Sequence, residues 1–191
     1  MNHLLTEAII FAAKAHEGQM RKFSKTPYIL HPLEVAGIIA TMTDDQKVMA
    51  AGVLHDVIED CGVDPAIIKE KFGARVAALV QSDSEDRIDP RPPAETWIER
   101  KSDSLLMLKH TRDMGVKIMW LGDKLSNMRS FCRAYKEHGN EIWQNLNQKD
   151  PAKQAWYYKT IAEYLSDLKD TFAYKEYLFL MDEVFGKEEL K

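Results

Sequence analysis

Residues 54–60 read LHDVIED, a stretch that places four polar side chains in a hydrophobic helical run. Such side chains are costly to bury without partners. Glu59 follows His55 by four positions, and Asp60 follows Asp56 by four, so each pair is expected to share one helix face. Imidazole and carboxylate groups gathered in this way suit Mn, Fe, Co, Ni or Zn better than Ca or Mg. The stretch therefore predicts part of a metal site in a helical protein.

Apolar side chains recur at helical spacing on both sides of this stretch, and no segment shows the alternation of a strand. Thr43 opens a capping box that should start the helix carrying residues 54–60. The predicted helices cover residues 4–15, 31–40, 44–61, 65–72, 74–80, 96–113 and 116–138, with two more between residue 151 and the C-terminus. We therefore predict an all-α fold, a single helical bundle that forms one domain over residues 1–191.

Composition excludes several classes of function. The chain has 191 residues, with 26 basic and 30 acidic side chains, and this net charge of −4 disfavours a nucleic-acid polymer as partner. No stretch approaches the ~20 apolar residues of a membrane span, so no membrane partner is expected. Cys61 and Cys132 lack close spacing, which favours two reduced thiols and a cytoplasmic location. Aromatic residues after residue 151 are expected to pack in the core or in a homodimer interface.

Two further polar residues are candidates to complete the metal site. His31 opens a helix beside Pro32, and Asp123 interrupts an apolar run. Together with His55 and Asp56 they would supply two nitrogens and at least two oxygens, which leaves positions for water and substrate. Each residue alone also has a structural interpretation: a core or capping histidine, a buried His–Asp hydrogen bond, or a helix N-cap at Asp123.

The order of these residues and their flanking motifs resembles the HD phosphohydrolase superfamily. The similarity is closest to the hydrolase domain of the RelA/SpoT alarmone enzymes, and it covers roughly residues 5–135, followed by a helical C-terminal extension to residue 191. The matching motifs are AHEGQMRK at 15–22, PYILHPL at 27–33, LHDVIED at 54–60, FG at 72–73 and DKLSNMR at 123–129. The chain is too short for a synthetase domain, so the resemblance implies a small, single-domain alarmone hydrolase of the HD type.

The resemblance also implies roles for individual residues. It implies a Mn²⁺ ion and removal of the 3′-pyrophosphate from (p)ppGpp, a small guanine nucleotide. The metal ligands it implies are His31, His55, Asp56 and Asp123. The acidic pair Glu59 and Asp60 would lie near the attacking water and act in catalysis. The implied nucleotide contacts are Arg21, Lys22, Asn127 and Arg129, with Arg21 packed on the guanine.

Other functions stay open at this stage. The substrate could instead be an adenine alarmone or NADPH, because Arg21 can stack on either purine. A non-catalytic alarmone sensor is a third interpretation, but the intact Glu59–Asp60 pair argues against it, since a sensor needs no water activator. The polar loop over residues 82–95 holds three prolines, and we expect it to be disordered or displaced without ligand.

Overall fold

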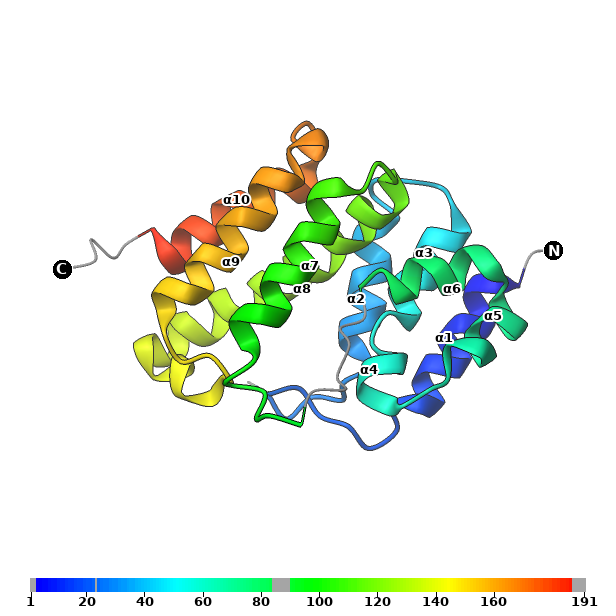
Figure 1. Cartoon of the computed structure of the whole chain (residues 1–191), viewed down its shortest axis with the longest axis horizontal. Helices are drawn as coiled ribbons and strands as arrows, with labels where there is room; N and C mark the ends of the chain where they lie inside the picture. Colours follow the sequence, from blue (N-terminus) through cyan, green and yellow to red (C-terminus); the bar gives the residue numbers. More distant parts are fainter. Residues whose placement is uncertain (1–2, 23, 84–89, 187–191) are drawn as a thin grey trace.

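The computed structural model describes residues 3–22, 24–83 and 90–186, and these fold as helices joined by short connections (Figure 1). The helices are α1 (Leu4–Ala15), α2 (Leu30–Ile39), α3 (Gln46–Leu54), α4 (Val57–Cys61), α5 (Pro65–Phe72), α6 (Ala74–Gln81), α7 (Trp97–His110), α8 (Met114–His138), α9 (Pro151–Tyr164) and α10 (Phe172–Phe185), with 3₁₀ turns at Gly139–Asn145 and Ser166–Leu168. Within the described ranges no strand forms, only an isolated bridge between Met20 and Pro27. The all-α prediction is confirmed.

The long helix α8 runs through the centre of the molecule. In Figure 1 the helices α1 to α6 gather on one side of it and α9 and α10 on the other, and α8 packs against α2, α3 and α10. Trp120, Leu121, Leu125 and Met128 of α8 are almost fully buried, and they belong to one continuous hydrophobic core. Burying each such side chain contributes roughly 1.5–3 kcal/mol. Helix α8 therefore joins the helices on its two sides through one hydrophobic core.

Glycine allows α2 to approach α8 closely. A Cβ atom at Gly122 would lie 3.0 Å from the Ile39 side chain and 3.3 Å from the Val35 carbonyl oxygen. The second distance involves backbone, which cannot move aside as a flexible side chain can. Gly122 immediately precedes Asp123, and Val35 lies one helical turn after His31. The close approach therefore sets the spacing between two predicted metal ligands.

The predicted helix over residues 44–61 is broken at His55 and Asp56, which separate α3 from α4. The His55 Nδ1 atom lies 2.8 Å from the carbonyl oxygen of Gly52. In a continuous helix that oxygen would accept from the backbone N–H of Asp56. Because the imidazole competes for this acceptor, the helix is interrupted, and the two predicted ligands lie in a turn between helices.

Two predicted helix ends are also corrected. The N-cap of α3 is Asp45, whose carboxylate accepts from the Lys47 N–H, so the helix starts later than a capping box at Thr43 would place it. α7 ends at His110, and Asp113 instead caps α8 by accepting from the Gly115 N–H. An ion pair with Arg75 of α6 lowers the pKa of Asp113 to about 2. Asp113 therefore begins the next helix, because its side chain satisfies free amides of that helix.

Other expectations are only partly tested. Cys61 and Cys132 are both free thiols, as predicted. Residues 84–89 of the predicted mobile loop lie outside the described residues, so its mobility stays a prediction. Among the helices of the described ranges, none is both long enough and apolar enough to cross a lipid bilayer.

Candidate metal centre

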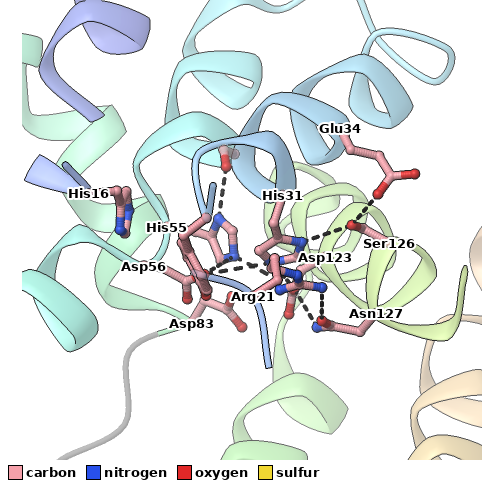
Figure 2. Close-up of polar contacts among 12 residues, drawn as sticks. His16, Arg21, His31, Glu34, His55, Asp56, Asp83, Asp123, Ser126 and Asn127 are labelled. Atoms are coloured by element: carbon pink, nitrogen blue, oxygen red, sulfur yellow. Dashed lines mark hydrogen bonds and ion pairs between the residues drawn. The ribbon is translucent and has the colours of Figure 1, made fainter. Parts of the chain in front are cut away.

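The four predicted metal ligands converge on one buried point, although they come from distant parts of the chain (Figure 2). His31 Nε2 lies 3.1 Å from Asp123 Oδ1 and 3.6 Å from Asp56 Oδ2. His55 Nε2 lies 2.9 Å from Asp56 Oδ2 and 3.6 Å from Asp123 Oδ1. One ligand atom from each of His31, His55 and Asp123 lies within 4.8 Å of the others. α2, the α3–α4 turn and α8 each supply part of this cluster.

Both imidazoles are held through Nδ1 and present Nε2 to the cluster. His31 Nδ1 contacts Ser126 Oγ at 2.8 Å, and His55 Nδ1 contacts the Gly52 carbonyl at 2.8 Å. Among the described residues, His55 Nε2 is buried without a hydrogen-bond partner, although two carboxylates surround it. Histidine ligands of metals are commonly oriented by a hydrogen bond at the other ring nitrogen. The donor set and the unpartnered Nε2 therefore fit a divalent transition metal.

The carboxylate charges of Asp56 and Asp123 also favour a cation at this point. Burial by itself would lower the pKa of His55, but the carboxylates of Asp56 and Asp123 outweigh it and raise that pKa well above the usual value. Burial would raise the pKa of Asp123, yet the Lys124 ammonium group and the two imidazoles hold it well below the usual range. The two carboxylates thus place negative charge around the imidazole nitrogens. Neutral imidazole and carboxylate are the forms in which these groups bind a divalent cation.

A polar cavity of about 260 Å³ opens beside the cluster. Glu59 and Asp60, the predicted acidic pair, line it together with the three lysines Lys22, Lys101 and Lys124. Lys124 is nearly buried, and burial would lower its pKa, but Asp123 and Asp83 raise that pKa well above the usual value. The cavity therefore places carboxylates and fixed positive charge next to the candidate metal position, an arrangement suited to a phosphate group and an attacking water.

Arg21 lines a second cavity, of about 610 Å³, together with His31. Its guanidinium donates to Asn127 Oδ1 at 3.3 Å and to Ser130 Oγ at 3.1 Å. Asn127 in turn donates to Asp123 Oδ1 at 2.7 Å, and Figure 2 shows this chain of contacts. His31 lines both cavities. Of the residues expected to contact a nucleotide, Lys22 and Asn127 thus line the first cavity and Arg21 lines the second.

Arg129, a predicted nucleotide contact, lines neither of the two cavities. Its guanidinium donates to Glu176 of α10 at 2.7 and 2.8 Å, and to Glu34 of α2 at 3.0 Å. The side chain lies six positions after Asp123, about 120° around the helix axis, so it faces another direction from the ligand. Its geometry supports an interhelix ion pair and gives no support to the predicted nucleotide contact.

Several residues that sequence reasoning did not single out also belong to the site. Tyr28 donates to Asp56 Oδ2 at 2.6 Å, and burial followed by the Asp56 charge raises the pKa of its hydroxyl, so it stays a donor. Asp83 lies 3.9 Å from the Lys124 ammonium group. Ser126 bridges His31 and Glu34. Tyr28 lies inside a matching motif, but its contact with Asp56 depends on tertiary structure.

Comparison with known proteins assigns the family. The HD domain family matches residues 8–152, and this chain belongs to it, which confirms the resemblance of the sequence motifs. Over 122 residues the chain is 41% identical to the guanosine-3′,5′-bis(diphosphate) 3′-pyrophosphohydrolase of Haemophilus influenzae, covering 63% of this chain and 18% of that protein. Over 127 residues it is 37% identical to the bifunctional (p)ppGpp synthase/hydrolase SpoT of Escherichia coli K12, covering 66% and 18%. The chain thus spans about 18% of the length of these relatives.

Two solved structures share the fold. The protein lmo0812 of Listeria monocytogenes EGD-e superposes with a TM-score of 0.71 at 28% identity, covering 82% of this chain and 99% of that one. A metazoan ortholog of SpoT, described as hydrolysing ppGpp, superposes with a TM-score of 0.73 at 24% identity, covering 100% and 98%. The second match extends the similarity in fold over the whole chain, including the helices after residue 152.

Proposed function

We propose that this chain is a Mn²⁺-dependent hydrolase that removes the 3′-pyrophosphate from the alarmone (p)ppGpp. The observation that carries the proposal is the convergence of His31, His55, Asp56 and Asp123 beside a cavity lined by Glu59, Asp60 and lysines. The names of relatives that are 37–41% identical to this chain support a guanine alarmone as substrate. The cytoplasmic location and the homodimer expected from the sequence stay predictions.

The residues divide the chemistry between them. When bound, the cation would polarise a phosphoryl oxygen and acidify water. Glu59 or Asp60 accepts a proton from the water that attacks the phosphorus of the 3′-pyrophosphate, and the bond from phosphorus to the ribose 3′-oxygen breaks. The carboxyl group then returns this proton to the departing 3′-oxygen, so the products are GDP or GTP and pyrophosphate. The ammonium groups of Lys22, Lys101 and Lys124 offset the charge that develops on the pyrophosphate.

The two cavities support one orientation of the bound nucleotide, with its pyrophosphate in the first cavity and its purine in the second. We place the pyrophosphate with Lys22 and Lys124, and the purine on the Arg21 side of His31. A guanidinium packs on a planar base better than an ammonium group does. Asn127, which contacts both Arg21 and Asp123, would then lie between the base and the metal.

A substrate panel tests this function. Purified protein is freed of metal with a chelator, checked by elemental analysis, and assayed with and without added Mn²⁺ on ppGpp, the adenine analogue and NADPH. We expect turnover of ppGpp that requires Mn²⁺ and releases pyrophosphate, and loss of that turnover in Asp123→Asn. Turnover without metal would refute the metal assignment. Preference for NADPH or the adenine analogue would move the substrate to the alternatives, and ppGpp binding without turnover would indicate a sensor.

A further inference from the structure

A relay of polar side chains runs from His31 to the C-terminal helix α10. We propose that Ser126 and Glu34 are positioning residues that fix the ring orientation and tautomer of His31, with Arg129 anchoring Glu34 to α10. The inference rests on the proposed function only in taking His31 as a metal ligand. Figure 2 shows the contacts from His31 through Ser126 to Glu34.

The number of protons available determines the direction of each hydrogen bond. The Glu34 carboxylate can only accept, so Ser126 uses its single proton to donate to Glu34 Oε2 at 2.6 Å. Ser126 Oγ can then only accept from His31 Nδ1, at 2.8 Å. The ring proton of a neutral His31 is therefore on Nδ1, and its lone pair is on Nε2. This is the atom that lies 3.1 Å from Asp123 in the candidate metal centre.

Because His31 and Ser126 are buried, water cannot substitute for either partner in the hydrogen bond between them. Ser126 is 0% exposed and His31 is 3% exposed. Loss of the serine hydroxyl would leave the Nδ1–H group buried without an acceptor. Partners of this kind behind histidine ligands typically contribute tenfold to a hundredfold in metal affinity.

Arg129 holds the far end of the relay. It donates to Glu34 Oε1 at 3.0 Å through one terminal nitrogen, and its other two nitrogens form a fork with Glu176 of α10. The two oxygens of Glu34 therefore have different partners, Arg129 on Oε1 and Ser126 on Oε2. Through this chain of bonds, helix α10 supports the orientation of His31.

The same geometry predicts an unusual effect of Glu34→Gln. Arg129 can only donate, so the new amide should turn its oxygen toward Arg129 and its NH₂ group toward Ser126. Ser126 would then accept from the amide and donate to His31 Nδ1. This reverses the tautomer and places a proton on Nε2, where the metal should bind. An isosteric change at a partly exposed residue should thus weaken metal binding.

Calorimetric titration with Mn²⁺ tests the relay. We expect the dissociation constant to rise tenfold to a hundredfold in both Ser126→Ala and Glu34→Gln, and Ser126→Thr, which keeps the hydroxyl, to bind more tightly than Ser126→Ala. Glu183→Gln is the matched control, because Glu183 pairs with Lys136 between the same two helices α8 and α10. It should bind Mn²⁺ like the wild type. Wild-type affinity in both Ser126→Ala and Glu34→Gln would overturn the proposal.

A second measurement separates positioning from a general loss of stability. Nitrogen-15 NMR of the histidines in metal-free protein at about pH 8, above their usual pKa range, should show His31 protonated on Nδ1 in the wild type and shifted toward Nε2 in Glu34→Gln. The same tautomer in both would refute the relay. If the wild type binds Mn²⁺ but does not hydrolyse ppGpp, the proposed function fails while the relay can still hold. If hydrolysis is normal and the variants bind metal normally, the relay alone fails.

Discussion

Glu59 and Asp60 follow His55 and Asp56 by four positions each and line the cavity that borders the metal centre. If they accept the proton of the attacking water, they act mainly in the transition state. Glu59→Gln keeps the volume of the side chain but cannot take a proton. We expect single-turnover hydrolysis of ppGpp to slow by about 10²–10⁴-fold in this variant, with little change in nucleotide affinity and full metal content.

The control for this prediction is Glu70→Gln, an exposed position on α5 that does not line the cavity. It should hydrolyse ppGpp at the wild-type rate. Asp60→Asn tests the second member of the pair in the same assay. Near-normal rates in both Glu59→Gln and Asp60→Asn would show that the pair is not catalytic, and loss of metal in either would make that residue a ligand.

For individual residues, the sequence identifies polar side chains that interrupt an apolar run. It does not identify residues whose role depends on a partner far away in the sequence. His55 and Asp123 stand out because each interrupts an apolar run. Ser126 and Glu34 do not, because the bond from His31 to Ser126 spans 95 positions. Arg129 shows the opposite case. Its place in a matching motif suggests a nucleotide contact, whereas the 3.6-residue period of the helix directs its side chain away from Asp123, and in the structure it pairs with Glu176.

Among the helices, the close approach of α2 and α8 makes a sharp prediction for Gly122→Ala. The added methyl group would meet the Val35 carbonyl oxygen and the Ile39 side chain, so α2 must shift relative to α8. Overpacking of this kind costs about 1–3 kcal/mol. Because His31 and Asp123 lie on the two helices, Mn²⁺ affinity should fall along with the free energy of unfolding measured in urea.

Gly37→Ala is the matched control, because Gly37 is also helical but its added methyl group would meet nothing within 4 Å. Alanine has a higher helix propensity than glycine, so this variant should be as stable as the wild type or more stable by up to about 1 kcal/mol. Equal stability of the Gly122 and Gly37 variants would contradict the packing argument.

The elements themselves were largely predictable, because helix periodicity and stop signals act locally. Gly73 and Gly139 end α5 and α8 as expected, and Asp64 caps α5. The break between α3 and α4 was not predictable, because it depends on the orientation of the His55 ring toward the Gly52 carbonyl. The break places the candidate ligands His55 and Asp56 in one turn. The predicted continuous helix is therefore wrong at the candidate metal centre.

Taken as a whole, the molecule gathers its candidate ligands from α2, the α3–α4 turn and α8, which approach one another only in the folded chain. The unfolded chain has no such site, so a metal that binds here should stabilise the native state. At a free Mn²⁺ concentration about 100 times the dissociation constant, the gain should be about 2.7 kcal/mol. For a chain of this length that raises Tm by about 5–10 °C. The measurement is thermal unfolding by circular dichroism with chelator and with Mn²⁺.

The variant Asp56→Asn tests whether the stabilising ion binds at this site. It replaces one carboxylate ligand whose side chain is 19% exposed, so the variant should fold yet show a much smaller shift in Tm. An equal shift in this variant would place the stabilising Mn²⁺ ion elsewhere on the molecule.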